Sequence, residues 1–230
     1  MRIVVISDIH SNNDALTVVL EKIRDYDALI CLGDLVGYGA EPNEVVETIR
    51  MLKPQIIIVG NHDYATVTGD TSDFVHHAVK AIEWTRKRLT MENMKYLSSL
   101  PYSSTFVANQ VTLKAYHGSP RDPLNEYVYP GIPNFILKGL LEMAEANVLL
   151  LGHTHVAFDA RIDTKLLINP GGVGQPRDGD PRASYAIIEI MDDNISCAIK
   201  RETYDIDSAA SKILQNSLPS FLADRLYLGV

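Results

Sequence analysis

Residue types that bind metal ions or transfer protons recur directly after the apolar runs of this sequence. Most of the 7 histidines stand in such positions. The groups concerned are Asp8-Ile9-His10, Gly33-Asp34, Gly60-Asn61-His62-Asp63, His117-Gly118 and Gly152-His153-Thr154-His155. Carboxylate, amide oxygen and imidazole donors are common protein ligands of divalent cations, and histidine also exchanges protons near neutral pH. The pattern therefore indicates metal-dependent or acid–base chemistry.

Each of these groups also has an ordinary structural explanation. A Gly-Asp pair after a strand is usually a turn, and a lone histidine beside an apolar run is more often packed or solvated than a ligand. Coincidence does not readily account for so many groups, each placed where an apolar run ends. We therefore expect these side chains to meet at one site.

The apolar runs themselves predict buried parallel strands. Residues 3–6, 28–32 and 56–59 are rich in Ile, Val and Leu without alternation, as strands covered on both faces are. Helical periodicity separates them at residues 15–23 and 44–52. This order predicts an α/β fold with right-handed crossovers, whose ligand crevice lies at the carboxyl ends of the strands.

Local signals refine this arrangement. Asn13 or Asp14 and then Asn43 are placed as N-caps of the two helices. The ligand-type pairs after the first strand and near residue 153 are spaced i, i+2, so each pair points to one side if strand geometry continues through it.

The later part of the chain shows a different pattern of expected helices and strands. Residues 72–97 predict one or two helices that form a cap-like insertion. The short, closely spaced strands that follow predict a mostly antiparallel second sheet packed on the first. These strands are expected at residues 104–107, 111–116, 148–151, 156–162, 166–168, 185–190 and 195–199, with a helix at 134–146. From Ser208 onward we expect a terminal helix with a loose end, and residues 1–230 as a single domain.

Composition limits the classes of partner. The chain of 230 residues has 21 basic and 29 acidic residues and a formal charge of −8, which argues against binding nucleic acid or an anionic membrane through bulk charge. Cys31 and Cys197 are too far apart in the sequence to suggest a disulfide framework or a thiolate zinc site. No apolar run is long enough to span a bilayer or form a signal-peptide core. We therefore expect a cytoplasmic protein with no membrane partner.

The ordered set of motifs resembles the calcineurin-like metallophosphoesterase family. The resemblance runs from Asp8 to His155, and Asn169-Pro170-Gly171-Gly172-Val173-Gly174 is similar to the glycine-rich turn of small bacterial and archaeal members. The family implies a four-layer αββα sandwich of two mixed sheets flanked by helices, with two metals at the strand ends and hydrolysis of phosphoric esters.

Matched position by position, the resemblance implies two metal sites. One is assigned to Asp8, His10, Asp34 and His155, and the other to Asp34, Asn61, His117 and His153. Asp34 bridges them, since a carboxylate can offer one oxygen to each of two cations about 3.5–4 Å apart. Two divalent transition-metal ions are therefore expected, and the donor set suits Mn, Fe, Zn, Ni or Co without choosing among them.

The same resemblance suggests a role for His62, and positions along the sequence suggest roles for the other polar residues. His62 faces the substrate and donates a proton to the departing alkoxide, or else it only hydrogen-bonds near the ligands. Asp63 either orients His62 or is a solvated turn residue. Arg177 is a candidate clamp for a substrate phosphate, Arg182 a weaker one. His76 and His77 are expected at the surface.

Charge counting favours an anionic substrate. Two divalent cations outweigh the two carboxylates of Asp8 and Asp34, even with a bridging hydroxide, so the site attracts phosphoryl oxygens despite the charge of −8. We expect hydrolysis of small phosphodiesters or phosphomonoesters by attack of a metal-bound hydroxide. Nucleic acid is not the expected partner, and the oligomeric state is open.

Two alternatives remain at this point. The family's protein phosphatases have a motif similar to G-D-x-V-D-R-G, whereas Gly33 begins the run G-D-L-V-G-Y-G here, and Val59 stands where their Asn-His motif has Arg. These differences argue against phosphoprotein specificity, and a protein or dinucleoside-polyphosphate phosphatase stays an alternative to the diesterase. The other alternative is a scaffold that keeps the fold without catalysis, as in the metallophosphoesterase-like subunit of a membrane-coat complex.

Overall fold

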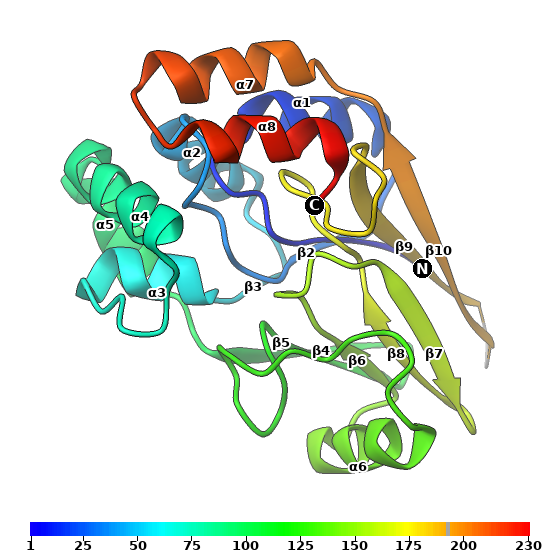
Figure 1. Ribbon diagram of the computed structural model, residues 1–230. Helices are drawn as coiled ribbons and strands as arrows, with labels where there is room; N and C mark the ends of the chain where they lie inside the picture. Colours follow the sequence, from blue (N-terminus) through cyan, green and yellow to red (C-terminus); the bar gives the residue numbers. More distant parts are fainter. Residues whose placement is uncertain (192–193) are drawn as a thin grey trace.

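Two five-stranded sheets form the centre of the computed structural model, which describes residues 1–191 and 194–230 (Figure 1). The first sheet has the order β10-β9-β1-β2-β3. Its strands are β1 (Arg2–Ile6), β2 (Ala28–Cys31), β3 (Ile56–Ile57), β9 (Ala183–Met191) and β10 (Asn194–Glu202). Parallel pairing joins β1 to β2 and β2 to β3, whereas β9 runs antiparallel to both β1 and β10, so this sheet is mixed.

The second sheet is also mixed and has the order β4-β5-β6-β8-β7. Its strands are β4 (Ser103–Ala108), β5 (Val111–Tyr116), β6 (Val148–Leu150), β7 (Phe158–Ile162) and β8 (Lys165–Asn169). The inner strands β5, β6 and β8 pair in parallel, and β4 and β7 add antiparallel edges.

The expectation of a mostly antiparallel sheet built from the later strands is wrong in two respects. The hairpin of β9 and β10 joins the first sheet, because β9 pairs with β1 with Ile188 opposite Ile3. The link between β5 and β6 contains a helix, which provides the length that a parallel connection needs. Short spacing along the chain predicts hairpins but does not say which sheet a hairpin joins.

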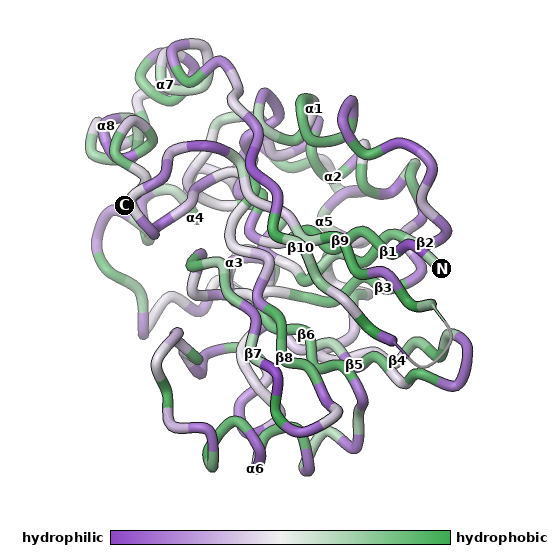
Figure 2. The backbone as a smooth tube through the Cα atoms, turned by 90° about the vertical axis from the view of Figure 1, so that its right-hand side faces the viewer, coloured by the Kyte–Doolittle hydropathy of each residue, from purple (hydrophilic) through white to green (hydrophobic). Residues whose placement is uncertain are grey.

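Helices complete four layers, confirming the αββα sandwich of two mixed sheets (Figures 1 and 2). They are α1 (Asn13–Lys22), α2 (Pro42–Leu52), α3 (Asn61–Thr68), α4 (His76–Arg88), α5 (Met91–Ser98), α6 (Asn134–Ala144), α7 (Ile206–Gln215) and α8 (Ser220–Leu228). Helix α6 packs on the outer face of the second sheet, while α1, α2, α7 and α8 contribute to the cluster on the outer face of the first.

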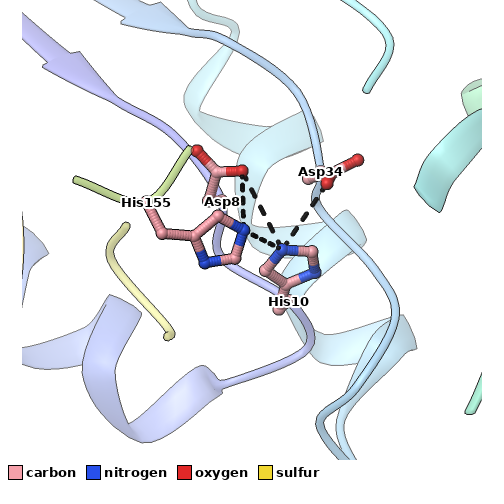
Figure 3. Close-up of side chains that lie close together, drawn as sticks. All are labelled: Asp8, His10, Asp34 and His155. Atoms are coloured by element: carbon pink, nitrogen blue, oxygen red, sulfur yellow. Dashed lines mark hydrogen bonds and ion pairs between the residues drawn. The ribbon is translucent and has the colours of Figure 1, made fainter. Parts of the chain in front are cut away.

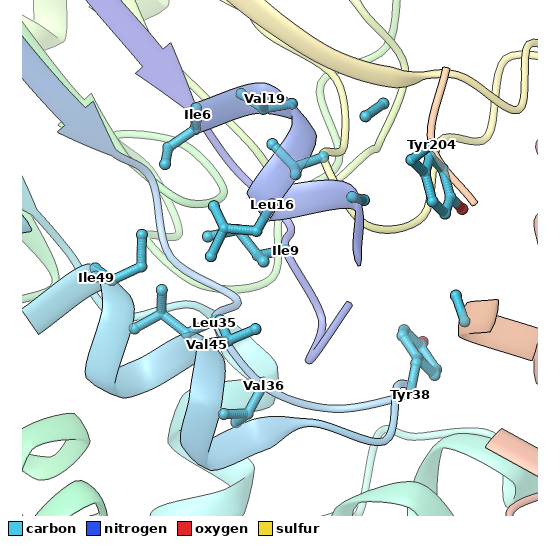
Figure 4. Packing of buried hydrophobic residues seen from close by; sticks show 14 of the residues in the cluster. Ile6, Ile9, Leu16, Val19, Leu35, Val36, Tyr38, Val45, Ile49 and Tyr204 are labelled. Atoms are coloured by element: carbon cyan, nitrogen blue, oxygen red, sulfur yellow. The ribbon is translucent and has the colours of Figure 1, made fainter. Parts of the chain in front are cut away.

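Alternation along the strands explains the layers. Val4 and Ile6 of β1 face the helices, where they pack with Leu16 of α1 in the cluster of Figure 4. Ile3 and Val5 face the opposite way, into the apolar layer between the two sheets. Because both faces of β1 are buried, its sequence is continuously apolar rather than alternating.

Helix ends differ in detail from the sequence expectation. Asn12 caps α1, accepting a hydrogen bond from Ala15 N at 3.1 Å, and α2 begins at Pro42 after Glu41 rather than at Asn43. The expected single helix after Ser208 is in fact the pair α7 and α8, with a turn around Leu218.

The segment 72–97 contains α4 and most of α5. Ala78, Ala81 and Leu97 of these helices are buried in the same apolar cluster as α1 and α2, so this segment packs into the helical layer. Within the described ranges, no helix combines the length and apolar character that crossing a bilayer requires.

Candidate metal centre

Four of the expected ligands form a compact cluster (Figure 3). Asp8 and His10 follow β1, Asp34 follows β2, and His155 follows β6. The donor atoms of Asp8, His10, Asp34 and His155 lie within 4.8 Å of one another, and all four side chains are buried. His155 Nε2 is 3.2 Å from Asp8 Oδ1, and His10 Nε2 is 3.5 Å from Asp34 Oδ2. This arrangement is a candidate metal site.

The other expected ligands also lie close to Asp34. His117 Nε2 is 3.3 Å from Asp34 Oδ2 and 3.2 Å from Asn61 Oδ1. The rings of His117 and His153 have centroids 5.1 Å apart. The structure thus brings all seven expected ligands together.

The buried polar atoms at this centre fit divalent cations. Asp8 Oδ1, Asp34 Oδ2 and His153 Nε2 are buried without a hydrogen-bond partner among the described residues. Leaving such atoms unsatisfied is costly, and a coordinated cation would remove the cost. The donors are oxygen and imidazole nitrogen, a set that suits Mn, Fe, Co, Ni or Zn.

Backbone carbonyls fix the orientation of three of the histidines. Nδ1 of His10 donates to Val36 O at 3.0 Å, Nδ1 of His117 donates to Leu32 O at 2.7 Å, and Nδ1 of His155 donates to Gln175 O at 2.5 Å. Since a carbonyl can only accept, each Nδ1 carries a proton, and each Nε2 can offer its lone pair to a cation once it carries no proton. Such partners behind metal ligands hold the rings in place.

The ligand residues have a left-handed backbone conformation and do not continue the strands that precede them. Strand β1 ends at Ile6, and φ is 53° at Asp8 and 49° at His10. Asp34, His153 and His155 also have positive φ, at 52°, 66° and 59°. The condition that strand geometry continues through the i, i+2 pairs is therefore not met. Aspartate and histidine enter this region more readily than most residues, and such strain concentrates at functional sites.

The glycine-rich turn 169–174 braces the loop that carries Asp8. Gly174 N donates to Asp8 O at 3.0 Å, and Val173 N donates to Ser7 O at 2.9 Å. A Cβ at Gly174 would lie 1.8 Å from Ile9 O, so only glycine allows this approach. Asn169 Nδ2 donates to Gly152 O at 2.7 Å and so ties the turn to the second histidine loop.

Electrostatics around Asp34 favour its ionised form. Burial by itself raises the pKa of Asp34, but the adjacent histidines, His117 first, outweigh burial and hold the pKa well below its usual value. Burial lowers the pKa of His117, yet the carboxylate of Asp34 outweighs it and raises that pKa to about 9. Burial lowers the pKa of His10 to about 4 and that of His153 to about 3, which keeps both imidazoles neutral, as metal ligands must be.

His62 lies beside the centre, in the first turn of α3. Its backbone N–H donates to Asp34 Oδ1 at 2.8 Å, and its ring centroid lies 4.4 Å from Tyr38 and 4.9 Å from Phe74. Its Nδ1 is buried without a partner among the described residues. Burial holds the pKa of His62 well below its usual value.

Asp63 is fully buried, so the solvated-turn interpretation is wrong. Its carboxylate accepts from Gly60 N and from Val36 N, each at 3.1 Å. Both contacts are to backbone amides, which places Asp63 as a brace between the α3 N-terminus and the loop after Asp34.

A cavity of about 460 Å³ opens over the centre. Asp34, His62 and His153 lie at its base, and Arg177 lines it as a candidate substrate-binding residue. Arg182 instead is exposed and pairs with Asp180.

The wall of the cavity also includes two residues that no sequence motif marks. Arg225 of α8 lines the wall, and so does His77, which was expected at the surface together with the exposed His76. The rings of His77 and Phe221 have centroids 4.9 Å apart. Local patterns cannot single out these residues, because α8 reaches the cavity only through tertiary packing.

An αββα sandwich with a buried carboxylate–histidine cluster at the ends of its strands defines a class of metal-binding α/β proteins. The chain belongs to the calcineurin-like phosphoesterase superfamily, whose domain matches residues 1–193. It is similar to an uncharacterized protein of Methanocaldococcus jannaschii, at 40% identity over 246 residues, which cover 99% of this chain and 98% of the relative.

Solved structures agree with this assignment. A metallophosphoesterase from Sphaerobacter thermophilus is 38% identical with a TM-score of 0.85, and the match covers 100% of both chains. A hypothetical protein from Pyrococcus horikoshii OT3 shares the fold with a TM-score of 0.91 at 23% identity, over 100% of this chain and 98% of the other.

Proposed function

We propose that this protein is a dinuclear-metal-dependent phosphoesterase that hydrolyses small phosphodiesters or phosphomonoesters. The observation that carries the proposal is the position of Asp34, which lines a cavity and whose Oδ2 lies 3.5 Å from His10 Nε2 and 3.3 Å from His117 Nε2. Two divalent transition-metal ions, when bound, supply positive charge for the phosphoryl group and activate water.

The ligand sets follow the two groups around Asp34. One ion is assigned to Asp8, His10, Asp34 and His155, and the other to Asp34, Asn61, His117 and His153. The unpartnered atoms Asp8 Oδ1, Asp34 Oδ2 and His153 Nε2 support the presence of cations among these ligands. Manganese is our first choice for loading, since the donor set admits it.

His62 is proposed as the proton donor to the leaving group. Its ring lines the cavity, and its backbone is tied to the central carboxylate through Asp34 Oδ1. Asp63 is proposed as a positioning residue, because its carboxylate holds the backbone at Gly60 and Val36. Arg177 is proposed to bind a phosphate group of the substrate. The two free cysteines are compatible with the cytoplasm, which is the compartment we propose.

The proposal is tested by hydrolysis of bis-p-nitrophenyl phosphate and p-nitrophenyl phosphate with added Mn²⁺, before and after chelation. We expect activity that is lost with chelator and restored by metal, and a loss of at least a hundredfold in Asp34→Asn. Asp159→Asn, an exposed carboxylate on β7, is the matched control and should retain activity. If the metal-loaded protein hydrolysed no activated ester, a non-catalytic scaffold would be favoured instead.

The role of His62 has a separate test. His62→Ala should slow an alkyl phosphate ester by roughly 10²- to 10⁴-fold, the usual size of general acid catalysis. It should slow a p-nitrophenyl ester far less, because that leaving group departs without protonation. Equal losses on both esters would contradict the assignment of His62 as the acid.

A further inference from the structure

Two guanidinium groups share one aromatic ring in the wall of the cavity. The Cζ atom of Arg177 lies 5.5 Å from the centroid of the Tyr38 ring, and that of Arg225 lies 5.8 Å from the same centroid. Arg225 also stacks on Phe221, at 5.3 Å. These contacts hold two like charges close together beside a largely buried ring.

No aspartate or glutamate side chain of the described residues pairs with either arginine. Nε and Nη2 of Arg177 donate to Gln175 Oε1, and Nε of Arg225 donates to Val230 O, so further N–H groups of both remain available. Arg225 is only 9% exposed. Asp73, the acidic residue that lines the cavity apart from Asp34, is exposed and pairs with neither arginine.

An unpaired, largely buried arginine is unfavourable without an anion. Burial, with the nearby charge of Arg177, lowers the pKa of Arg225 to about 10. By contrast, Arg182 lies outside the cavity and has a carboxylate partner in Asp180. The cavity wall therefore holds two guanidinium groups that pair with no aspartate or glutamate side chain in the described part of the chain.

The two arginines differ in their position relative to the metal centre. Tyr38 contacts His10 and His62, with ring centroids 4.7 Å and 4.4 Å apart. Arg177 lies next to the centre, since its backbone N–H donates to His155 O at 3.0 Å, whereas Arg225 belongs to α8. Arg225 is therefore the outer of the two arginines.

Arg225 is also outside the part of the chain that defines the family. The superfamily domain matches residues 1–193, whereas α8 spans Ser220–Leu228. Its place in the cavity follows from the packing of this chain's own C-terminal helices, with Leu222 and Leu226 buried in the apolar cluster.

We propose that Arg177 and Arg225 form a second anion-binding subsite, which takes a second phosphate group carried by the substrate beyond the one that is hydrolysed. This inference rests on the proposed function and narrows its substrate class to compounds with two phosphate groups. The scissile phosphate lies at the metal centre, and Arg177 and Arg225 hold the other. Tyr127 and Phe221 also line the cavity and flank the organic part of such a substrate.

The test uses non-hydrolysable probes that differ only in the second anion. Binding of alkylphosphonates and of alkane-α,ω-bisphosphonates with increasing spacer length is measured by calorimetry on the metal-loaded protein. We expect at least one bisphosphonate to bind about ten- to a hundredfold more tightly than the monophosphonate of the same length, as a charge-assisted contact predicts. If no bisphosphonate in the series binds more tightly, the subsite is refuted without any variant.

Variants identify the residue responsible. Arg225→Gln should remove the advantage of the bisphosphonate while leaving monophosphonate affinity within about twofold, and Arg225→Lys should keep part of it. Arg182→Gln, the exposed control, should bind both probes as the wild type does. An advantage that persists in a folded Arg225→Gln protein would overturn the assignment. Failure of the proposed function would be distinct, since the monophosphonate itself would then not bind in a metal-dependent way.

Discussion

Replacing Gly60 by Ala tests whether the position of Asp34 controls the centre. A Cβ at Gly60 would lie 2.1 Å from Asp34 Oδ1 and 2.3 Å from Asp34 N, where ordinary contacts need about 3.5 Å. The backbone at Gly60 has φ of −97° and ψ of 172°, which alanine adopts freely, so the effect is steric. Asp34 or the loop before α3 must shift by about 1 Å.

This shift should weaken metal binding and catalysis more than folding. Overpacking costs about 1–3 kcal/mol of unfolding free energy, whereas a misplacement of about 1 Å at a reacting centre can cost 10²-fold in rate. We expect Gly60→Ala to retain a cooperative urea transition, to hold less metal by elemental analysis after purification, and to lose about a hundredfold in kcat/KM on bis-p-nitrophenyl phosphate.

Gly139→Ala is the matched control. Gly139 lies inside α6, and a Cβ there would meet no atom within 4 Å. This variant should be more stable by about 0.5–1 kcal/mol, the usual gain of alanine over glycine in a helix, with metal content and turnover unchanged. Wild-type metal content and kcat/KM in Gly60→Ala would refute the argument that Asp34 must stay in its present place.

Three further predictions concern the centre and the core. Because Asp34 raises the pKa of His117 to about 9, metal binding near pH 7 should release about one proton from His117, and metal affinity should rise with pH until about 9. Calorimetry in buffers of different ionisation enthalpy measures the proton release. A heat of binding that does not depend on the buffer would count against it. Chelation should lower the melting temperature of the wild type, since cations bind the folded state, and have little effect in Asp34→Asn. Leu16→Ala should cost about 2–5 kcal/mol in urea unfolding, because Leu16 is fully buried, whereas Met51→Ala, at a position 73% exposed, should change stability by less than about 0.5 kcal/mol.

Much of the site is predictable because its residues follow buried strands. The apolar character of β1 and β2 is a local property of the sequence, and the polar residues after these strands must share one edge of the sheet. The sequence alone therefore predicts that Asp8 and Asp34 lie close together. Their assignment to metals depends on the family resemblance of the whole set of motifs.

Other features depend on contacts between distant segments. The left-handed backbone at Asp8 and His10 is held by hydrogen bonds to the loop after β2 and to the turn that contains Gly174, which no local pattern encodes. The hairpin of β9 and β10 joins the first sheet because β9 pairs with β1, although the two strands are far apart in the chain.

The sequence by itself determined the α/β class and the polar groups at the strand ends, because strand burial and turn chemistry act over a few neighbouring residues. Only the tertiary structure decided which residues surround those groups. Arg225 and His77 reach the cavity through the packing of α8 against α4, and Asp63 turns inward to brace two loops. Such contacts arise from the shape of the whole apolar core, which the spacing of residues along the chain does not specify.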